Sequence, residues 1–169
     1  MALVMTEAGH IAIAAAMKNM SFYLGVGGLP DDYPNKWAVT DKEIPPFDPN
    51  STELILPFGY KKAQRVVYVV EDNINGSIVF EDKRYSESQE PTSHLYIEFL
   101  LDTDEVVDKV IYQLGLFINL QPNPSLPPGQ LFFTPDQVVD TGILYIGENV
   151  KPIYKQSGVK EIYSLVLNF

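Results

Sequence analysis

The stretch TGILYIGENVKPIYKQSGVKEIYSLVLNF, from Thr141 to Phe169, contains two apolar runs separated by polar residues, glycine and proline. The first run extends over residues 142–149 and the second over residues 160–169, and both carry the β-branched and aromatic side chains that strands favour. Proline cannot donate a ladder hydrogen bond, so Pro152 should end the first strand and redirect the chain. We therefore predict a C-terminal β-hairpin over residues 142–169.

The tripeptide Asp140-Thr141-Gly142 opens this block and matches the catalytic loop of a retroviral-type aspartic protease. Such an enzyme would be a homodimer in which two carboxylates share one proton. However, the bulky Ile143 follows the glycine where a small residue is needed, and the chain that remains is too short for the rest of that barrel. We predict that Asp140 and Gly142 form a turn that starts a strand. A homodimeric aspartic protease that uses Asp140 is kept as a remote alternative.

Upstream of this block, further runs of β-branched and aromatic residues predict strands. They are SFYLGVGG (residues 21–28), AQRVVYVVED (63–72), GSIVFEDKRY (76–85), HLYIEFLLD (94–102) and DKVIYQLGLFINL (108–120). The sequence INGS is typical of a hairpin turn between the second and third of these strands. The acidic DTDEVVD predicts a solvated hairpin turn between the last two.

One helix and two irregular segments complete the predicted fold. Thr6 and Glu7 are typical of a helix start, and the apolar pattern continues to about Met20. Residues 29–50 and 121–130 are rich in proline, which excludes a helix or a central strand from both. We predict a mainly β (α+β) fold, with an antiparallel β sandwich-like core, one N-terminal helix and two Pro-rich loops or arms. Residues 1–169 should form a single β-rich domain.

Composition and charge argue against several classes of function. The formal net charge of −10 disfavours nucleic-acid binding, which needs a basic face. The apolar stretch HIAIAAAM is too short to insert into a membrane. No cysteine is present, which fits synthesis in a reducing cytoplasm. The acidic segment 102–108 lacks the glycine of a calcium loop, and His10 and His94 are widely separated, so we predict no metal, no cofactor and no catalytic residue.

The first Pro-rich loop carries three large aromatic side chains, Tyr33, Trp37 and Phe47. Aromatic side chains on a proline-stiffened segment lose little entropy on binding, which is typical of interface hot spots. The alternative is that the loop folds back and these rings pin it to its own domain. The sequence favours neither interpretation over the other.

The C-terminal block also holds an ordered set of residues, Gly142, Tyr145, Ile146, Glu148, Asn149, Pro152, Ile153, Glu161, Ile162 and Phe169. In order and spacing it resembles the closing segment of the baseplate wedge subunit family of contractile-tailed, T-even-like bacteriophages, the gene eight product type. The helix, the FYLGVGG strand and the loop with Trp37 are similar to that family's opening. The T-even subunit is longer, and this chain lacks its large middle insertion.

The resemblance implies a structural virion protein of the tail baseplate wedge that is not an enzyme and acts through protein–protein contacts in assembly. It implies other baseplate or tail proteins as partners, and a homodimer or a place in a hetero-oligomeric wedge. The opening TEAGHIAIAAAM is also similar to tail-fibre and collar proteins, so an adaptor of that kind is the alternative. The predicted partner-binding residues are Tyr33, Trp37, Phe47, Tyr145, Asn149, Pro152, Ile153 and Phe169.

Overall fold

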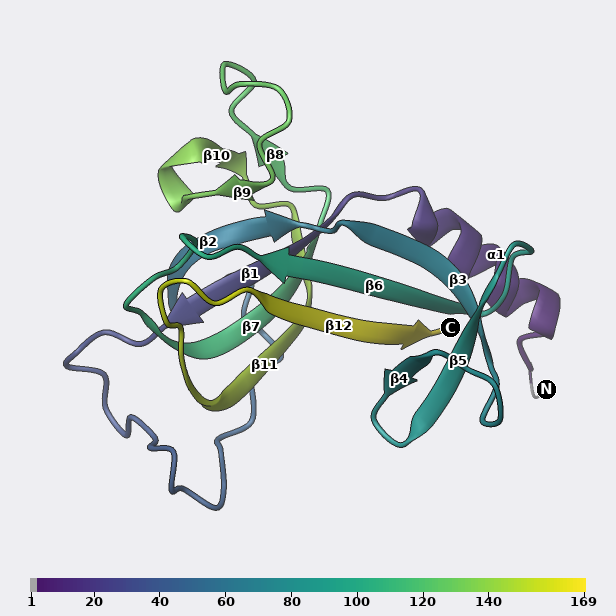
Figure 1. The fold of residues 1–169 in the computed structure, drawn as a ribbon, viewed down its shortest axis with the longest axis horizontal. Coiled ribbons are helices and arrows are strands. Elements are labelled where there is room, and N and C mark those ends of the chain that lie inside the picture. The colour runs from purple at the N-terminus through teal and green to yellow at the C-terminus, as the bar shows by residue number, and fades with distance from the viewer. Residues whose placement is uncertain (1–2) are drawn as a thin grey trace. The chain divides into compact units, whose positions relative to one another are not determined.

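A computed structural model describes residues 3–169 of the chain (Figure 1). The predicted class is confirmed, since the fold is mainly β, with antiparallel sheets, a sandwich-like core and one helix near the N-terminus. The chain divides into two compact units. Unit 1 holds residues up to 20, 63–99 and 162–169, and unit 2 holds residues 21–62 and 100–161. That the two units form a single domain remains a prediction.

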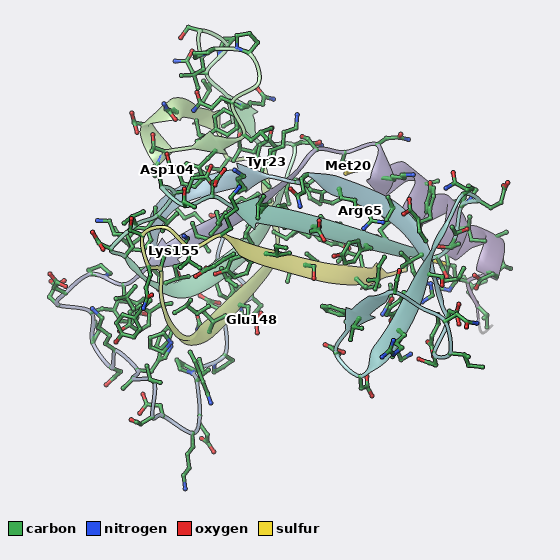
Figure 2. All side chains as sticks on the ribbon, in the orientation of Figure 1. Met20, Tyr23, Arg65, Asp104, Glu148 and Lys155 are labelled. Atoms are coloured by element: carbon green, nitrogen blue, oxygen red, sulfur yellow. The ribbon has the colours of Figure 1, made fainter. Side chains whose placement is uncertain are left out.

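Unit 1 is built on a five-stranded sheet of strand order β12-β6-β3-β5-β4. Its strands are β3 (Arg65–Glu71), β4 (Ile78–Phe80), β5 (Lys83–Ser88), β6 (His94–Leu101) and β12 (Glu161–Asn168). Arg65, labelled in Figure 2, forms an ion pair of 2.5 Å with Glu87 of β5, and its guanidinium lies over the ring of Tyr96. These exposed contacts add little stability, so burial of apolar side chains must hold the sheet together.

The helix of unit 1, α1 (Glu7–Lys18), starts where the sequence predicts. The Thr6 hydroxyl accepts a hydrogen bond from the amide of Gly9, which satisfies one of the free donors at a helix start. The helix contacts the sheet of its own unit, because the Lys18 ammonium lies 4.1 Å from the ring centre of Tyr68. At its first turn, Glu7 accepts a hydrogen bond of 3.1 Å from the hydroxyl of Ser93.

Unit 2 is built on a second five-stranded sheet, of order β11-β7-β1-β2-β9. Its strands are β1 (Phe22–Gly28), β2 (Leu56–Lys62), β7 (Val110–Ile118), β9 (Phe132–Phe133) and β11 (Ile143–Tyr154). A small pair is formed by β8 (Gln121–Pro122), at the start of the second Pro-rich segment, and β10 (Val138–Asp140), and the 3₁₀ helix η1 (Pro135–Gln137) lies between β9 and β10. The central strand β1 is buried along its whole length, which is why it reads as a continuous apolar run.

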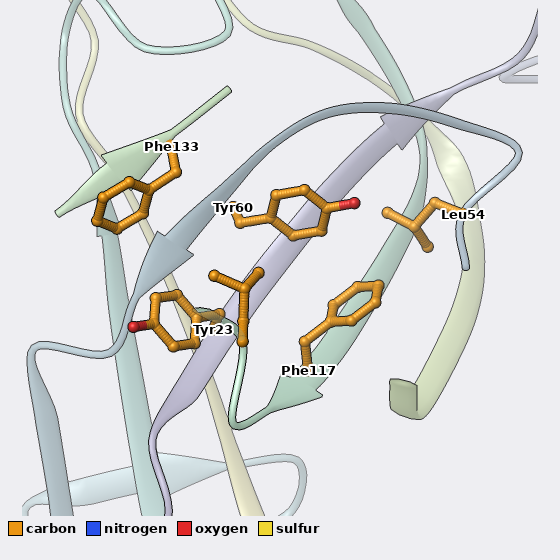
Figure 3. Packing of buried hydrophobic residues seen from close by; sticks show 6 residues of the cluster. Tyr23, Leu54, Tyr60, Phe117 and Phe133 are labelled. Carbon is orange, nitrogen blue, oxygen red and sulfur yellow. The ribbon is translucent and has the colours of Figure 1, made fainter. Parts of the chain in front are cut away.

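The core of unit 2 is aromatic (Figure 3). Tyr60 and Phe117 meet edge to face, with ring centres 5.1 Å apart. Gly25 of β1 and Gly115 of β7 lie opposite each other, and a side chain at Gly25 would come within 2.5 Å of the Phe117 ring. These glycines therefore leave room for the ring. The core residues are Tyr23, Leu54, Tyr60, Phe117, Leu120 and Phe133.

The predicted C-terminal hairpin over residues 142–169 is wrong in its pairing. Both strands form, but β11 pairs with β7 in unit 2, and β12 lies next to β6 in unit 1. Each strand is held by a different core, since Leu144 packs in unit 2 whereas Val166 is buried in unit 1. The ammonium of Lys155 donates to the carbonyls of Gln156 and Val159, so side-chain contacts and not a tight hairpin turn shape the connection.

Two other predicted hairpins are wrong for related reasons. The segment 102–109 connects β6 to β7, which belong to different sheets. The INGS turn joins β3 to β4, but β5 lies between them and pairs with both. The backbone of Asp72 explains this order, because its amide donates to Arg84 while its carbonyl accepts from Gly76. The predicted Pro-rich loops are confirmed, since residues 29–50 hold no helix or strand and residues 121–130 hold only the two-residue β8.

Candidate protein interaction site

The first Pro-rich loop folds back onto β11 and β7 of its own unit. Trp37 is only 5% exposed, and its indole N–H donates a hydrogen bond of 2.7 Å to the carbonyl of Val150. Its ring meets Tyr112 of β7 edge to face, with centres 5.3 Å apart. Tyr33 packs against the same cluster. Burial in this cluster raises the pKa of the Tyr112 hydroxyl, and the charge of Tyr154 adds to the effect.

A relay of side-chain amides ties the loop to the sheet. The buried Gln113 of β7 accepts from the amide of Ile55 at 2.8 Å and donates to the Asn149 side chain at 2.9 Å. Asn149 then donates to the carbonyls of Pro45 and Pro46, at 2.9 and 3.2 Å. The two prolines lack an N–H but keep their carbonyls, so an amide side chain is a suitable partner for them.

The third aromatic residue of the loop contacts a glycine of β11. A side chain at Gly147 would come within 2.3 Å of the Phe47 ring, so the absence of a side chain there lets the ring lie against the strand. Phe47 also packs against the aromatic core of unit 2. Tyr33, Trp37 and Phe47 thus hold the loop against its own unit. This is the second of the two interpretations that the sequence leaves open. A role in binding a partner stays a prediction for them.

The other predicted site residues are spread over the chain. Asn149 joins the loop contacts, as described, while Pro152 is buried in β11 and the partly buried Ile153 is paired with Ile111. Phe169 belongs to unit 1, where its amide donates to the carbonyl of Ser93 at 3.0 Å. Tyr145 is 45% exposed. The structure therefore gathers four of the eight residues around the loop and leaves Tyr145 accessible on an edge strand.

We define the β11 strip as Ile143, Tyr145 and Ile146, at the start of β11. β11 is an edge strand, and these side chains are 62%, 45% and 41% exposed. The register shifts between Leu144 and Ile146, so Tyr145 lies in a β-bulge without a partner on β7. A bulge turns neighbouring side chains toward the same side and hinders further strand pairing. Glu148, labelled further along β11 in Figure 2, is exposed too.

Asp140 forms the corner that leads into this strip, as the turn interpretation predicts. Its carboxylate accepts a hydrogen bond of 2.8 Å from the amide of Gly142, and Asp140 is itself exposed. Gly142 has a φ of +69°, and a side chain there would come within 2.2 Å of the Ile118 carbonyl. The carboxylate therefore has a structural partner in its own turn.

The acidic segment 102–108 is less solvated than predicted. The carboxylate of Glu105 is 14% exposed and lies 2.6 Å from the ammonium of Lys61, which is 8% exposed. Asp102 pairs with Lys160 at 3.4 Å. Among residues 3–169, no group of three or more acidic or histidine side chains is arranged to hold a metal ion. No helix within the same residues is long and apolar enough to cross a membrane.

Sequence reasoning misses two features of this region. Gln113 is the central residue of the amide relay, and its signal is a single polar residue inside the apolar run VIYQLGLFI. Ile143 and Ile146 fall within the predicted hairpin, although only an edge strand leaves them exposed. Which edge of a sheet stays open depends on strand order, and strand order cannot be read from local sequence patterns.

Comparison with known proteins identifies the family of the chain. A search of curated proteins gave no match. A family model described as "Baseplate wedge 3 tail fiber network component" matches residues 1–169, the whole chain. This match confirms the predicted resemblance to baseplate wedge proteins of phage tails. The chain belongs to the baseplate wedge 3 tail fiber network component family and is a structural component of a phage tail baseplate.

Proposed function

We propose that this chain is a stoichiometric subunit of the baseplate wedge that acts through protein–protein contacts and performs no catalysis. The observation that carries the proposal is the β11 strip. Three large apolar side chains remain exposed side by side on an edge strand, and exposed apolar clusters are typical of interaction surfaces. We assign the strip to contacts with another baseplate protein or with a second copy of this chain.

The partners follow from the chemistry of the strip and from the charge of the chain. Isoleucine and tyrosine side chains supply apolar area, and the tyrosine hydroxyl adds a polar contact at the rim. The net charge of −10 favours protein partners with basic rims and disfavours nucleic acid. The chain is made in the host cytoplasm and reaches the tail by assembly. Membrane insertion has no role in this proposal.

A tail-fibre adaptor is the second candidate function. The description of the family includes a tail fiber network, which favours a contact with fibre proteins at the edge of the wedge. The two candidates use the same strip but differ in the partner. Cross-linking of assembled tails through a reactive group at residue 145 separates them, because the adaptor function predicts a fibre protein as the cross-linked product.

Incorporation into tails tests the proposal. The double variant Tyr145→Lys, Ile146→Lys places two charges on the strip, and desolvating them would oppose any apolar contact. We expect the variant to fold, as seen by circular dichroism, but to be missing from purified tails. Ile74→Lys, at another exposed apolar residue, is the matched control and should be incorporated normally. Normal incorporation of the strip variant would overturn the proposal.

Self-association is measured separately, by light scattering at several concentrations. A homodimer through the strip predicts twice the chain mass of 19.0 kDa for the wild type. The double strip variant should give the monomer mass under the same conditions. A wild-type monomer at all concentrations would exclude the homodimer and restrict the strip to contacts with other proteins.

The protease alternative is tested with Asp140→Asn. Asparagine keeps an oxygen that can accept from the amide of Gly142, so the turn should persist and incorporation should stay normal. The readout of the enzyme class is pepstatin-sensitive cleavage of a denatured protein substrate at acid pH. Cleavage by the wild type that Asp140→Asn abolishes would contradict our proposal.

A further inference from the structure

The Pro-rich loop 29–50 is attached to unit 2 by side-chain contacts and not by strand pairing. Trp37 donates to Val150, Asn149 donates to two proline carbonyls, and Phe47 lies against Gly147. No residue of the loop belongs to a helix or strand that would extend it into the sheet. A few localised contacts of this kind define the docking site of the loop on the sheet.

The packing beneath and beside the loop is incomplete. A cavity of about 300 Å³ lies between the loop and the sheet, lined on the sheet side by Gln113 and Asn149 and next to β2 by Ile55. An open hollow of about 400 Å³ lies on the surface of the loop and is lined by residues 35–37, 41 and 43–46. Protein interiors are normally close-packed, and loosely packed segments open at low free-energy cost. The contact between loop and sheet is therefore interrupted at the first of these spaces.

The contacts between loop and sheet are made by neutral groups, except that the Lys36 ammonium lies 5.4 Å from the ring centre of Tyr112. An indole N–H, a side-chain amide, two carbonyls and a phenyl ring form the attachment. The same segment of a second copy carries the same groups in the same order, so it fits this site equally well. No pair of like charges in these contacts opposes docking between two chains.

We propose that the loop 29–50 is an exchangeable arm, which in the assembled baseplate docks on β11 and β7 of a second copy of this chain. This inference rests on the proposed function, because it requires neighbouring copies. Exchange of an identical element is a low-cost route to association, since the interactions that the arm makes within its own chain form again between two chains. It adds a second interaction surface beside the β11 strip.

The anchors and the stiffness of the arm fit this role. Leu29 and Leu54 are buried and anchor the two ends of the arm. The arm would therefore pivot at the residues that follow Leu29 and precede Leu54. Gly28 and Leu56 are partners in the ladder between β1 and β2, so the two ends of the arm leave the sheet next to each other. Proline-rich segments extend by about 3.1 Å per residue, so each half of the arm can reach on the order of 30 Å. That reach is sufficient to cross to an adjacent subunit.

Engineered cysteines test the exchange directly, because the chain has none of its own. One variant is Phe47→Cys, which opens space over Gly147, and the other is Gly147→Cys, whose side chain would collide with the Phe47 ring. Neither variant alone holds a facing pair of cysteines. Mixed and oxidised together, they form a disulfide only when the loop of one chain docks on β11 of another.

We expect a disulfide-linked dimer in the mixture and little in either variant alone. In the double variant, the ratio of linked dimer to internally linked monomer should rise with protein concentration. Internal linkage of the double variant at every concentration, with no dimer in the mixture, would overturn the exchange. Pro46→Cys with Asn149→Cys is a second pair, for use where Gly147→Cys does not fold. Incorporation of the strip variant into tails is read separately, so failure of exchange leaves the proposed function standing.

Discussion

At the residue scale, Gly142 is the position where backbone conformation and space act together. Gly142→Ala must adopt a φ of +69° and place a methyl group within 2.2 Å of the Ile118 carbonyl. Gly129→Ala is the matched control, because Gly129 also has a positive φ, of +89°, but nothing lies within 4 Å. We expect a loss of about 1 kcal/mol for Gly129→Ala, from the left-handed conformation alone. Gly142→Ala should lose at least about 2 kcal/mol more, measured by urea unfolding, and equal losses would contradict the steric explanation.

Asn149 offers a second residue-scale prediction. Asn149→Asp keeps the shape of the side chain but removes the N–H donors to Pro45 and Pro46 and turns a carboxylate toward their carbonyls. We expect a loss of about 1–3 kcal/mol in the free energy of unfolding. The single tryptophan, Trp37, should become more solvent-exposed, which shifts its fluorescence to longer wavelength. Asn168→Asp, at an exposed position, is the control and should change neither quantity appreciably.

At the scale of elements, a buried ion pair connects β2 to the segment before β7. Lys61→Met leaves the carboxylate of Glu105 buried without its cation, which should cost about 3–5 kcal/mol in urea unfolding. Lys83→Met is the control, since it breaks the exposed pair with Glu71, which solvent screens, and it should leave the free energy of unfolding nearly unchanged. Adding Glu105→Gln to Lys61→Met should recover part of the loss. Equal losses for the two lysine variants would contradict the difference in burial.

The turn between β3 and β4 gives a pH-dependent prediction. The backbone N–H of Asn75, and then the hydroxyl of Ser86, lower the pKa of Asp72 below its ordinary value of about 3.9. A lowered folded-state pKa contributes stability that is present above the unfolded pKa and is lost as pH falls through the folded pKa. The stability difference between wild type and Asp72→Asn should therefore shrink as pH falls below about 4. Urea unfolding from pH 7 to pH 3 checks this, and a constant difference would contradict it.

How much of the fold can be predicted also depends on the element. The helix start at Thr6 and the two Pro-rich loops are local features, and the sequence predicts both correctly. The predicted hairpins are wrong because neighbouring strands along the chain belong to different cores. Leu144 and Val166 are both apolar, and only the assembled sheets decide that one packs in unit 2 and the other in unit 1. A local sequence pattern predicts where the strands lie but not which strands pair with each other.

At the scale of the whole molecule, the family is accessible from the sequence, while the surface that carries the proposed function is not. The family resemblance includes both Tyr145 and Ile146, but of the exposed residues at the start of β11 only Tyr145 is predicted from the sequence to bind a partner. Its neighbours Ile143 and Ile146 become visible as part of one strip only because β11 is an edge strand with a bulge at Tyr145. The loop aromatics show the opposite outcome, since Trp37 is largely buried in its own chain. Exposure is a property of the folded chain, so both assignments need the structure.

The most direct test of the central claim is hydroxyl-radical footprinting of the free chain and of the same chain in purified tails. Tyr145 is reactive toward radicals and is accessible in the free chain, and Met20 of unit 1 serves as the internal reference. We predict that the ratio of modification at Tyr145 to modification at Met20 falls strongly in assembled tails, because the β11 strip is covered by a partner. An unchanged ratio would show that Tyr145 remains exposed in the virion and would contradict the account.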